Sequence, residues 1–312
     1  MNLEKATVEI LLATYQSDAY WREQIDSILN QTDTNWQLLI HDGGSTDSTL
    51  DIVRLYEQKY PHKIHLLGSC RASACRNFSQ LLEAATAELV MLCDHDDVWL
   101  PEKIALTRKK FIEETNQCGP NTPLLVFSDL TIVDRNLKMI FPSLMNYSNL
   151  SPKRLSLQHL LVQNVPHGNT MMINAALCRL VHPIPMKAVM HDNWISLTAA
   201  AFGRIAYLDQ TTLLYRQHEC NIFGASCYSI PSLIKKIYDG RKKLMLRWNL
   251  NVRQAQAFLE CNKKRLNPKQ IQMLELFSDI KHAGFLKKRY ILYRYGIWKT
   301  GIMRNIGMLL VI

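Results

Sequence analysis

Residues 89–99 read Leu89-Val90-Met91-Leu92-Cys93-Asp94-His95-Asp96-Asp97-Val98-Trp99, a short apolar run that ends in three carboxylates within four positions. The apolar run predicts a buried strand with the carboxylates at its carboxyl end. Carboxylates this close repel one another unless a cation or strong hydrogen-bond donors compensate their charge. A hard divalent ion with oxygen ligands would do so. The alternative is an acidic surface turn in which Asp97 caps a helix that begins near Pro101.

The chain before this stretch alternates between strand and helix patterns. Apolar, β-branched runs predict strands at residues 8–13, 36–41 and 64–67, and helical spacing predicts helices at 19–31, 48–60 and 73–85. This alternation is typical of βαβ units, so we expect an α/β fold with a mostly parallel central sheet flanked by helices.

Polar residues follow several of these strands. Thr14 and Tyr15 follow the first strand, Asp42 follows the second, and the carboxylates from Asp94 to Asp97 follow the fourth. In parallel sheets, ligands bind at the carboxyl ends of the strands. The coincidence predicts one binding site at that edge of the sheet.

The remaining chain continues the pattern and then changes character. We expect a helix at 101–115, a strand at 124–129, a loop at 141–152, a strand at 170–174, a helix from about 191 to 203, and two late strands at 205–208 and 212–215. From Pro231 onward the pattern is helical, with turns expected near Asn249, Asn267-Pro268 and Gly284.

The segment DGGSTD, residues 42–47, allows a tight turn from strand to helix. Asp42 at its start can accept hydrogen bonds from a base or ribose. The alternative is a plain turn with Ser45 or Asp47 as a helix cap. No dinucleotide-binding GxGxxG follows this strand, which disfavours a nicotinamide enzyme.

Composition limits the class of protein. The chain has 312 residues, 47% of them hydrophobic, which suits a globular protein of one large or two modest domains. Its eight cysteines form no CxxC pair, and several lie in apolar runs, as expected for reduced thiols in a cytosolic protein. No apolar signal segment and no run of about 18 apolar residues is present, so we expect no spanning helix.

Three segments together resemble the successive motifs of family-2 glycosyltransferases, which are inverting enzymes with the GT-A fold. They are ATYQ at 13–16, DGGSTD at 42–47 and CDHDDVW at 93–99. Later segments resemble bacterial rhamnosyltransferases of cell-surface polysaccharide synthesis. They are FSDLTIVD at 127–134, GNTMMIN at 168–174, HDNW at 191–194 and LYRQH at 214–218. The resemblance covers roughly residues 6–226 and implies a Rossmann-like GT-A catalytic domain at 1–226.

The resemblance implies a role for particular residues. Thr14, Tyr15 and Asp42 would hold the nucleobase and ribose. Asp94 would face the ribose, and Asp96 would bind Mg²⁺ or Mn²⁺ at the donor diphosphate. Asp192 would be the general base. His218 would bind the metal ion or the diphosphate, and Arg216 would lie nearby in the donor site.

Independent chemical reasoning agrees with these roles. A divalent ion neutralises the charge that develops on a departing diphosphate, and a separate carboxylate must deprotonate the attacking hydroxyl. Asp192 could also cap a helix, which is compatible with a base. His218 and Arg216 could be basic strand-end residues. The segment 70–77 lacks the glycine expected at this helix start, so Arg71 either reaches the donor or is solvated.

The C-terminal region, residues 227–312 of the expected division, is strongly basic. From Pro231 onward it holds 18 Lys and Arg against 4 Asp and Glu, a net charge of +14 in a chain of net charge +10. Its mixture of cations, aromatics and aliphatics suits a helix on an anionic membrane surface. The alternative is a bundle that packs on the catalytic body or on a second subunit of a homo-oligomer. No nucleic-acid-binding motif is present.

We therefore expect an inverting, metal-dependent glycosyltransferase at the inner face of the plasma membrane. The expected donor is dTDP-rhamnose, with a UDP-hexose or UDP-N-acetylhexosamine as the alternative, and the expected acceptor is a lipid-linked glycan. A hypothesis from another class is a non-catalytic module that binds sugar nucleotides or glycans, which predicts binding without turnover.

Overall fold

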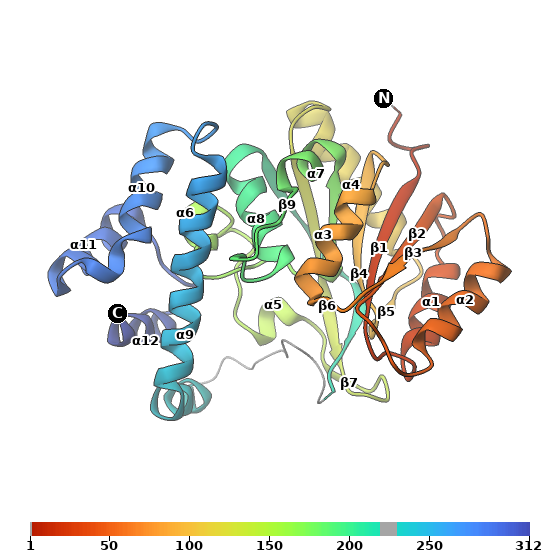
Figure 1. The fold of residues 1–312 in the computed structure, drawn as a ribbon. Helices are drawn as coiled ribbons and strands as arrows, with labels where there is room; N and C mark the ends of the chain where they lie inside the picture. Colours follow the sequence, from red (N-terminus) through yellow and green to blue (C-terminus); the bar gives the residue numbers. More distant parts are fainter. Residues whose placement is uncertain (1, 219–229) are drawn as a thin grey trace.

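The computed structural model describes residues 2–218 and 230–312. The expected boundary between catalytic and C-terminal regions, at residues 226 and 227, lies outside the described residues. The described parts form a mixed α/β structure around one curled sheet, with helices on both faces (Figure 1).

The N-terminal half of the sheet is parallel, as expected. Its strands are β1 (Val8–Thr14), β2 (Trp36–Asp42), β3 (Ile64–Ser69) and β4 (Leu89–Asp94), arranged in the order β3-β2-β1-β4. The helices α1 (Trp21–Leu29), α2 (Thr49–Lys59) and α3 (Ala74–Ala84) connect them. The expected α/β fold is confirmed, and the expected bounds of these elements differ from the observed ones by one to two residues.

The second half of the sheet contains antiparallel pairs. Strand β8 (Met171–Asn174) lies antiparallel between β4 and β6 (Leu124–Val133), and β9 (Arg204–Arg216) runs parallel to β6. Two short strands, β5 (Val98–Trp99) and β7 (Met139–Phe141), pair with β9 and β6 respectively. The expectation of two late strands is wrong, because the polar residues at 209–211 continue a single strand whose pairing shifts register there.

Further helices cover the sheet and the site. They are α4 (Lys103–Cys118), α5 (Leu144–Tyr147), α6 (Leu157–Leu160), η1 (Gly168–Thr170), α7 (Ala175–Val181) and α8 (His191–Phe202). Helix α5 lies inside the segment expected to be loop. The carboxylate of Asp129 accepts hydrogen bonds from the backbone N–H groups of Leu144 and Met145, so a distant strand residue fixes this turn of helix.

The basic region forms α9 (Ile230–Asn262), α10 (Pro268–Ser278), η2 (Ile280–His282), α11 (Phe285–Tyr295) and α12 (Ile302–Val311). The turn expected near Asn249 is wrong. Trp248 and Val252 are one helical turn apart and both buried, so packing holds this segment of α9 helical. Asn267 and Gln270 form a capping box at the start of α10. The turn expected at Asn267-Pro268 is therefore confirmed.

The C-terminal helices pack on the α/β body formed by the preceding elements. The ring of Phe258 on α9 meets that of Trp194 on α8 edge-on, with centroids 5.2 Å apart. The side chain of Gln254 accepts a hydrogen bond of 2.7 Å from the backbone N–H of Val189. Figure 1 shows α9 standing beside α8, with α10 to α12 on its far side. Of the two packing alternatives for the tail, contact with the catalytic body is therefore present.

In the described part of the chain, no helix combines the length and the apolar character that crossing a bilayer requires.

Candidate active site

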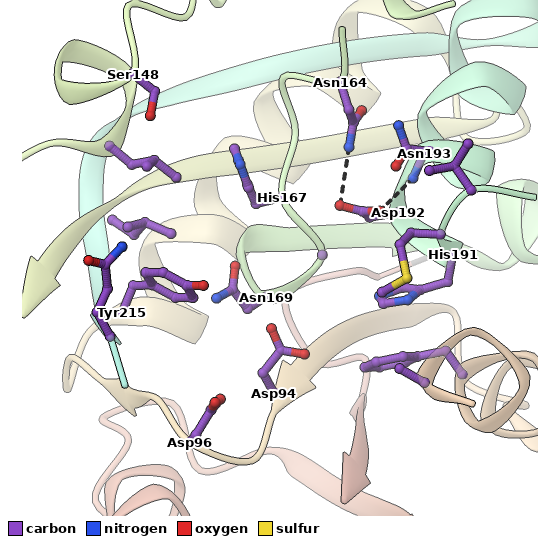
Figure 2. A pocket seen from close by; sticks show the side chains of 18 of the residues that line it. Asp94, Asp96, Ser148, Asn164, His167, Asn169, His191, Asp192, Asn193 and Tyr215 are labelled. Carbon is purple, nitrogen blue, oxygen red and sulfur yellow. Dashed lines mark hydrogen bonds between the residues drawn. The ribbon is translucent and has the colours of Figure 1, made fainter. Parts of the chain in front are cut away.

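A cavity of about 1680 Å³ lies at the carboxyl ends of β1 and β4. Its wall includes the start of α3, the loop after β4, the segment around η1, the start of α8 and the C-terminal helices α9 and α12. Figure 2 shows Asp94 and Asp96 on one side of this cavity and Asp192 on another. The edge of the sheet predicted to bind a ligand therefore borders the cavity.

Asp94 is the last residue of β4, and its neighbour in the pairing is Ala13 on β1. Among the described residues, its carboxylate accepts no hydrogen bond. Burial and the negative charges of Asp96 and Asp192 together raise the pKa of Asp94 to about 7, although the charge of Lys103 acts in the opposite direction. The nearby positive charge of Lys103 therefore compensates only part of the cost of ionising this carboxylate.

Asp96 and His218 meet across the cavity floor. The Nε2 atom of His218 lies 2.9 Å from Oδ2 of Asp96, although 122 residues separate the two in sequence. Burial raises the pKa of Asp96, but the hydrogen bond from His218 and the charges of His95 and His218 outweigh it, and the net pKa is lowered. The ring of Tyr20 packs against that of His218 with centroids 4.8 Å apart. Tyr20 is a site residue that the sequence reasoning missed.

Asp97 does not cap a helix, so that expectation is wrong. Its side chain is fully buried and accepts a hydrogen bond of 2.6 Å from Nδ2 of Asn169. Burial and the charges of Asp96 and Asp94 raise the pKa of Asp97 well above its usual value. Below the site lies Lys103, which is also fully buried and donates to the backbone carbonyl of Asn169 at 2.9 Å. Asp97 and Lys103 thus support the floor of the cavity from beneath.

Arg216, expected near the donor, is buried behind the site. Its guanidinium donates to the backbone carbonyls of Asp96 (3.0 Å) and Arg135 (2.7 Å) and forms an ion pair with Glu23 on α1. The guanidinium also lies over the ring of Tyr20, 4.7 Å from its centroid. These contacts fix the backbone that carries Asp96. No local sequence pattern marks Glu23 or Tyr20 as a residue of the site, because each is a single polar or aromatic residue near the start of an amphipathic helix.

The residues expected at the nucleotide divide into two groups. Thr14 and Tyr15 line the cavity. The hydroxyl groups of Thr14 and Ser17 form a hydrogen bond, and 54% of the surface of Tyr15 is exposed. Asp42 is fully buried and does not line the cavity. Arg71 is exposed and does not line it either.

The carboxylate of Asp42 instead organises the loop that follows it. It accepts hydrogen bonds from the N–H groups of Gly44 and Ser45 at 2.8 Å, and from the hydroxyl groups of Ser45 and Ser69. Gly44 has a φ of +85°, a conformation that favours glycine, and a Cβ on Gly43 would lie 2.9 Å from Nδ2 of Asn77. The turn therefore favours glycine at position 44, and a side chain at position 43 would displace that of Asn77.

Asp192 lies in the first turn of α8 and faces the cavity. Its carboxylate accepts hydrogen bonds from the backbone N–H of Asn193 (2.7 Å) and from Nδ2 of Asn164 (3.1 Å), both drawn in Figure 2. Burial raises the pKa of Asp192 to about 6, while these bonds and one from the Gly168 backbone act in the opposite direction. The group is poised to exchange a proton near neutral pH.

The neighbours of Asp192 hold it tightly. His191 stacks on Phe78 with ring centroids 3.8 Å apart, and burial lowers its pKa to about 3, so the imidazole is neutral. A Cβ on Gly168 would lie 2.7 Å from Nε2 of His191 and 3.5 Å from Cβ of Asp192. The absence of a side chain at Gly168 lets η1 approach α8 closely.

The described residues contain no preformed group of three or more His, Cys, Asp or Glu side chains that could hold a metal. The chemistry of the floor nevertheless fits a hard divalent ion. Asp96 and His218 offer one oxygen and one nitrogen side by side, and the carboxylate of Asp94 accepts no hydrogen bond from the described residues. Two or three protein ligands suffice for an ion that keeps water and phosphate oxygens in its shell.

Comparison with known proteins adds the family. The sequence profile described as glycosyl transferase family 2 matches residues 9–150. A dTDP-rhamnosyl transferase, RfbG of Shigella flexneri, is 26% identical over 228 residues, which are 69% of this chain and 74% of the relative. An uncharacterized glycosyltransferase of Nostoc sp., alr2836, is 28% identical over 218 residues, 69% of this chain and 66% of the relative. The chain thus covers about two thirds to three quarters of these relatives.

Solved structures share the fold. A mannosyltransferase from Pyrobaculum calidifontis, in complex with GDP-Man and Mn²⁺, superposes with a TM-score of 0.56 at 16% identity, over 98% of this chain and 79% of that one. TarS 1–349 of S. aureus, in complex with UDP-GlcNAc, superposes with a TM-score of 0.54 at 15% identity, over 98% of this chain and 90% of that one. Residues 9–150 therefore carry a glycosyl transferase family 2 domain, and the chain has the GT-A fold.

Proposed function

We propose that this chain is a metal-dependent, inverting glycosyltransferase that moves a sugar from a nucleoside diphosphate to a hydroxyl group of a glycan. The observation that carries the proposal is that one cavity joins the Asp94, Asp96 and His218 group to Asp192. A transferase of this kind needs a polar floor for a diphosphate and a separate base for the acceptor, and both face the same space.

The donor would bind with its diphosphate at the cavity floor. Asp96 and His218 would hold Mg²⁺ or Mn²⁺, which neutralises the charge that develops on the departing diphosphate. Asp94 would face the ribose, and Thr14 and Tyr15 the nucleobase end. Arg216 is a positioning residue in this proposal, because its guanidinium holds the Asp96 carbonyl. Asp42 likewise shapes the loop after β2.

Asp192 would act as the general base. The acceptor hydroxyl must lose its proton as its oxygen forms a bond to the anomeric carbon, while the bond from that carbon to the diphosphate oxygen breaks with its electron pair. Asp192 receives the proton. Because one carboxylate suffices and no second nucleophile is required, a single displacement inverts the anomeric configuration.

The donor that we propose is dTDP-L-rhamnose. The support is the relative named as a dTDP-rhamnosyl transferase, at 26% identity. UDP-sugars remain the alternative, since a structure of the same fold binds UDP-GlcNAc. A donor screen with purified protein, Mn²⁺ and a panel of dTDP- and UDP-sugars tests this by release of the nucleoside diphosphate. Release from UDP-sugars but not from dTDP-rhamnose would refute the rhamnosyl assignment.

A non-catalytic binding module is the alternative from another class. It predicts that donor binds without any release of nucleoside diphosphate. The raised pKa of Asp192, in a first helical turn beside the donor floor, favours an enzyme over a module that only binds.

We also propose that α11 and α12 lie on an anionic membrane surface, where a lipid-linked acceptor would be found. On α11, Leu286, Tyr290 and Tyr293 form one exposed stripe, and on α12 Ile302, Ile306 and Leu310 form another. A hydrogen bond of 2.9 Å from Arg289 to the carbonyl of Leu309 joins the two helices. Lys287 and Arg294 flank the first stripe, and such cations favour anionic lipid headgroups.

Vesicle co-sedimentation tests this surface. We expect the protein to pellet with vesicles that contain phosphatidylglycerol but not with phosphatidylcholine alone. A variant with Leu286, Tyr293 and Ile302 changed to Ser should remain in the supernatant. A matched variant with the exposed residues Leu55, Leu67 and Met139 changed to Ser should pellet. Equal pelleting of both variants would refute the proposal. The proposal would also be refuted if the unmodified protein formed a dimer that binds no vesicles and the first set of substitutions converted this dimer to monomers.

A further inference from the structure

The cavity continues beyond the catalytic carboxylates to a second end with opposite charge. There its wall is formed by α9, which contributes Arg247, by the segment before α12, which contributes Lys299, and by α12, which contributes Arg304. The acidic residues of the cavity wall, Asp94, Asp96, Asp134 and Asp192, all come from the catalytic body. The charges of the cavity are therefore sorted, with carboxylates towards the sheet and cations towards the C-terminal helices.

Lys299 is held rigidly at this end. Its backbone N–H donates to Oδ1 of Asn305 at 2.8 Å, and its backbone carbonyl accepts from Nδ2 of the same side chain at 2.8 Å. Lys299 lines the cavity, and its ammonium group has no ion pair or hydrogen bond among the described residues. Burial, together with the charges of Arg247 and Arg304, lowers the pKa of Lys299 to about 8, so the group is still mostly protonated at pH 7.

The other two cations differ in what they contact. Arg304 donates to the backbone carbonyls of Ser148, Asn149 and Thr300, so it also ties α12 to the catalytic body. Arg247 is exposed on α9 and has no ion pair among the described residues. Lys299 and Arg247 face one partly enclosed space and repel each other, and the described residues offer neither of them an ion pair. An anionic ligand would compensate them.

We propose that this end of the cavity is a subsite for a phosphate group carried by the acceptor, with Lys299 as its central contact and Arg247 beside it. Guanidinium and ammonium groups are the side chains that bind phosphate oxygens best. The donor diphosphate belongs to the carboxylate end with its metal ion, so the cationic end is left for the second substrate. Trp248, Met303 and Met308 line the space next to the cations and suit an apolar group attached to that phosphate. The assignment to the acceptor rests on the proposed glycosyltransferase function.

Two sources of such a phosphate share this chemistry. One is a diphosphate that joins a glycan to a lipid, and the other is a phosphodiester within a polymer. Inorganic pyrophosphate represents the first and glycerophosphoglycerol the second. Tighter binding of one probe identifies the source, and Lys299-dependent binding of either supports the subsite.

Calorimetric titration of the full chain in EDTA at pH 7 tests the proposal. Without a metal ion, the carboxylate end repels these anions, so the titration reports on the cationic end. Lys299→Gln should weaken binding by about tenfold or more, because a charge-assisted contact is lost. Lys299→Arg should keep the affinity within about threefold, since the charge remains. Lys264→Gln, at an exposed lysine on the turn after α9, is the matched control and should leave binding unchanged.

Two results would overturn the subsite: no binding of either probe to the unmodified chain, or equal binding to the Lys299→Gln and Lys264→Gln variants. A thermal melt establishes that Lys299→Gln is folded, and removal of a half-buried ammonium that has no ion pair among the described residues should not lower its Tm. The titration contains no donor and no turnover. Failure of the subsite therefore leaves the proposed function standing, and Lys299-dependent binding without any sugar transfer would refute the function alone.

Discussion

The hydrogen bond from Asn164 to Asp192 gives a quantitative test of the proposed base. Asp192 must be ionised to accept a proton, so activity should rise with pH up to its pKa of about 6 and then level off. The Nδ2 atom of Asn164 donates to the ionised carboxylate and thereby lowers this pKa. Replacement of Asn164 by Ala removes the donor, so the pKa of Asp192 should rise.

The size of the change follows from the bond. A hydrogen bond to a charged group contributes about 1.5–3 kcal/mol, and one pKa unit corresponds to about 1.4 kcal/mol. Because Asp192 faces the cavity, water replaces part of the lost bond, and we take the lower limit. The acid limb of kcat/KM should therefore move up by about one pH unit.

The assay is direct chromatography of released nucleoside diphosphate at saturating Mn²⁺, from pH 5 to 8. The positive charge of the metal ion favours the ionised forms of its ligand Asp96 and of Asp94 nearby. Asn164 donates to Asp192 and to neither of these carboxylates, so a difference between the two profiles reports on Asp192. Asn121→Ala, at an exposed loop residue, is the matched control and should leave the profile unchanged. An acid limb that stays in place in Asn164→Ala, or moves to lower pH, would refute the reasoning.

Three further predictions concern the supports of the site. In Gly168→Ala, the new methyl group would collide with the ring of His191, which cannot move away because it stacks on Phe78. We expect kcat to fall about a hundredfold with the donor Kd unchanged, and an unchanged kcat would contradict this. His218→Ala should raise the Mn²⁺ concentration needed for half-maximal activity about tenfold or more, measured by metal titration, and an unaltered titration would exclude His218 as a ligand. Lys103→Met leaves the buried Asp97 without its nearby cation and should lower the free energy of unfolding by about 3 kcal/mol, measured by urea denaturation; a neutral effect would show that Asp97 is protonated.

Local sequence patterns were sufficient for much of the fold. The strand and helix patterns of residues 8–94 predicted the βαβ units, because apolar periodicity is a property of neighbouring residues. The order of polar residues after the strands also pointed to one edge of the sheet, and Thr14, Tyr15, Asp94 and Asp96 do line one cavity there. Asp192 and His218 were expected from resemblance, and both line the same cavity.

What the sequence could not supply depends on contacts between distant segments. Asp97 looked like a helix cap, but Asn169, 72 residues away, pairs with it in the interior. Arg216 looked like a donor ligand, but Glu23 and the Asp96 carbonyl occupy its guanidinium. The polar residues at 209–211 looked like a loop because nothing local indicates that β6 continues beside them.

The sequence also could not show which segments complete the wall of the cavity. The sequence marked the C-terminal region as basic and helical, and left open whether it covers membrane or protein. The packing of α9 on α8 brings Arg247 to the same cavity as Asp192. Hydrogen bonds from Thr300 to Gln163 and from Arg154 to the carbonyl of Trp298 hold the segment that carries Lys299 there. The C-terminal region, which the sequence pattern presents as a separate basic extension, is thus part of the cavity wall.

The most direct test of the account is acceptor-dependent release of nucleoside diphosphate by Asp192→Asn, compared with Asp51→Asn at an exposed position on α2. The account predicts that Asp51→Asn is as active as the unmodified chain. It predicts that Asp192→Asn binds donor normally but turns over about a thousandfold more slowly, since the general base is lost. Turnover by Asp192→Asn at the rate of the unmodified chain would contradict the central claim.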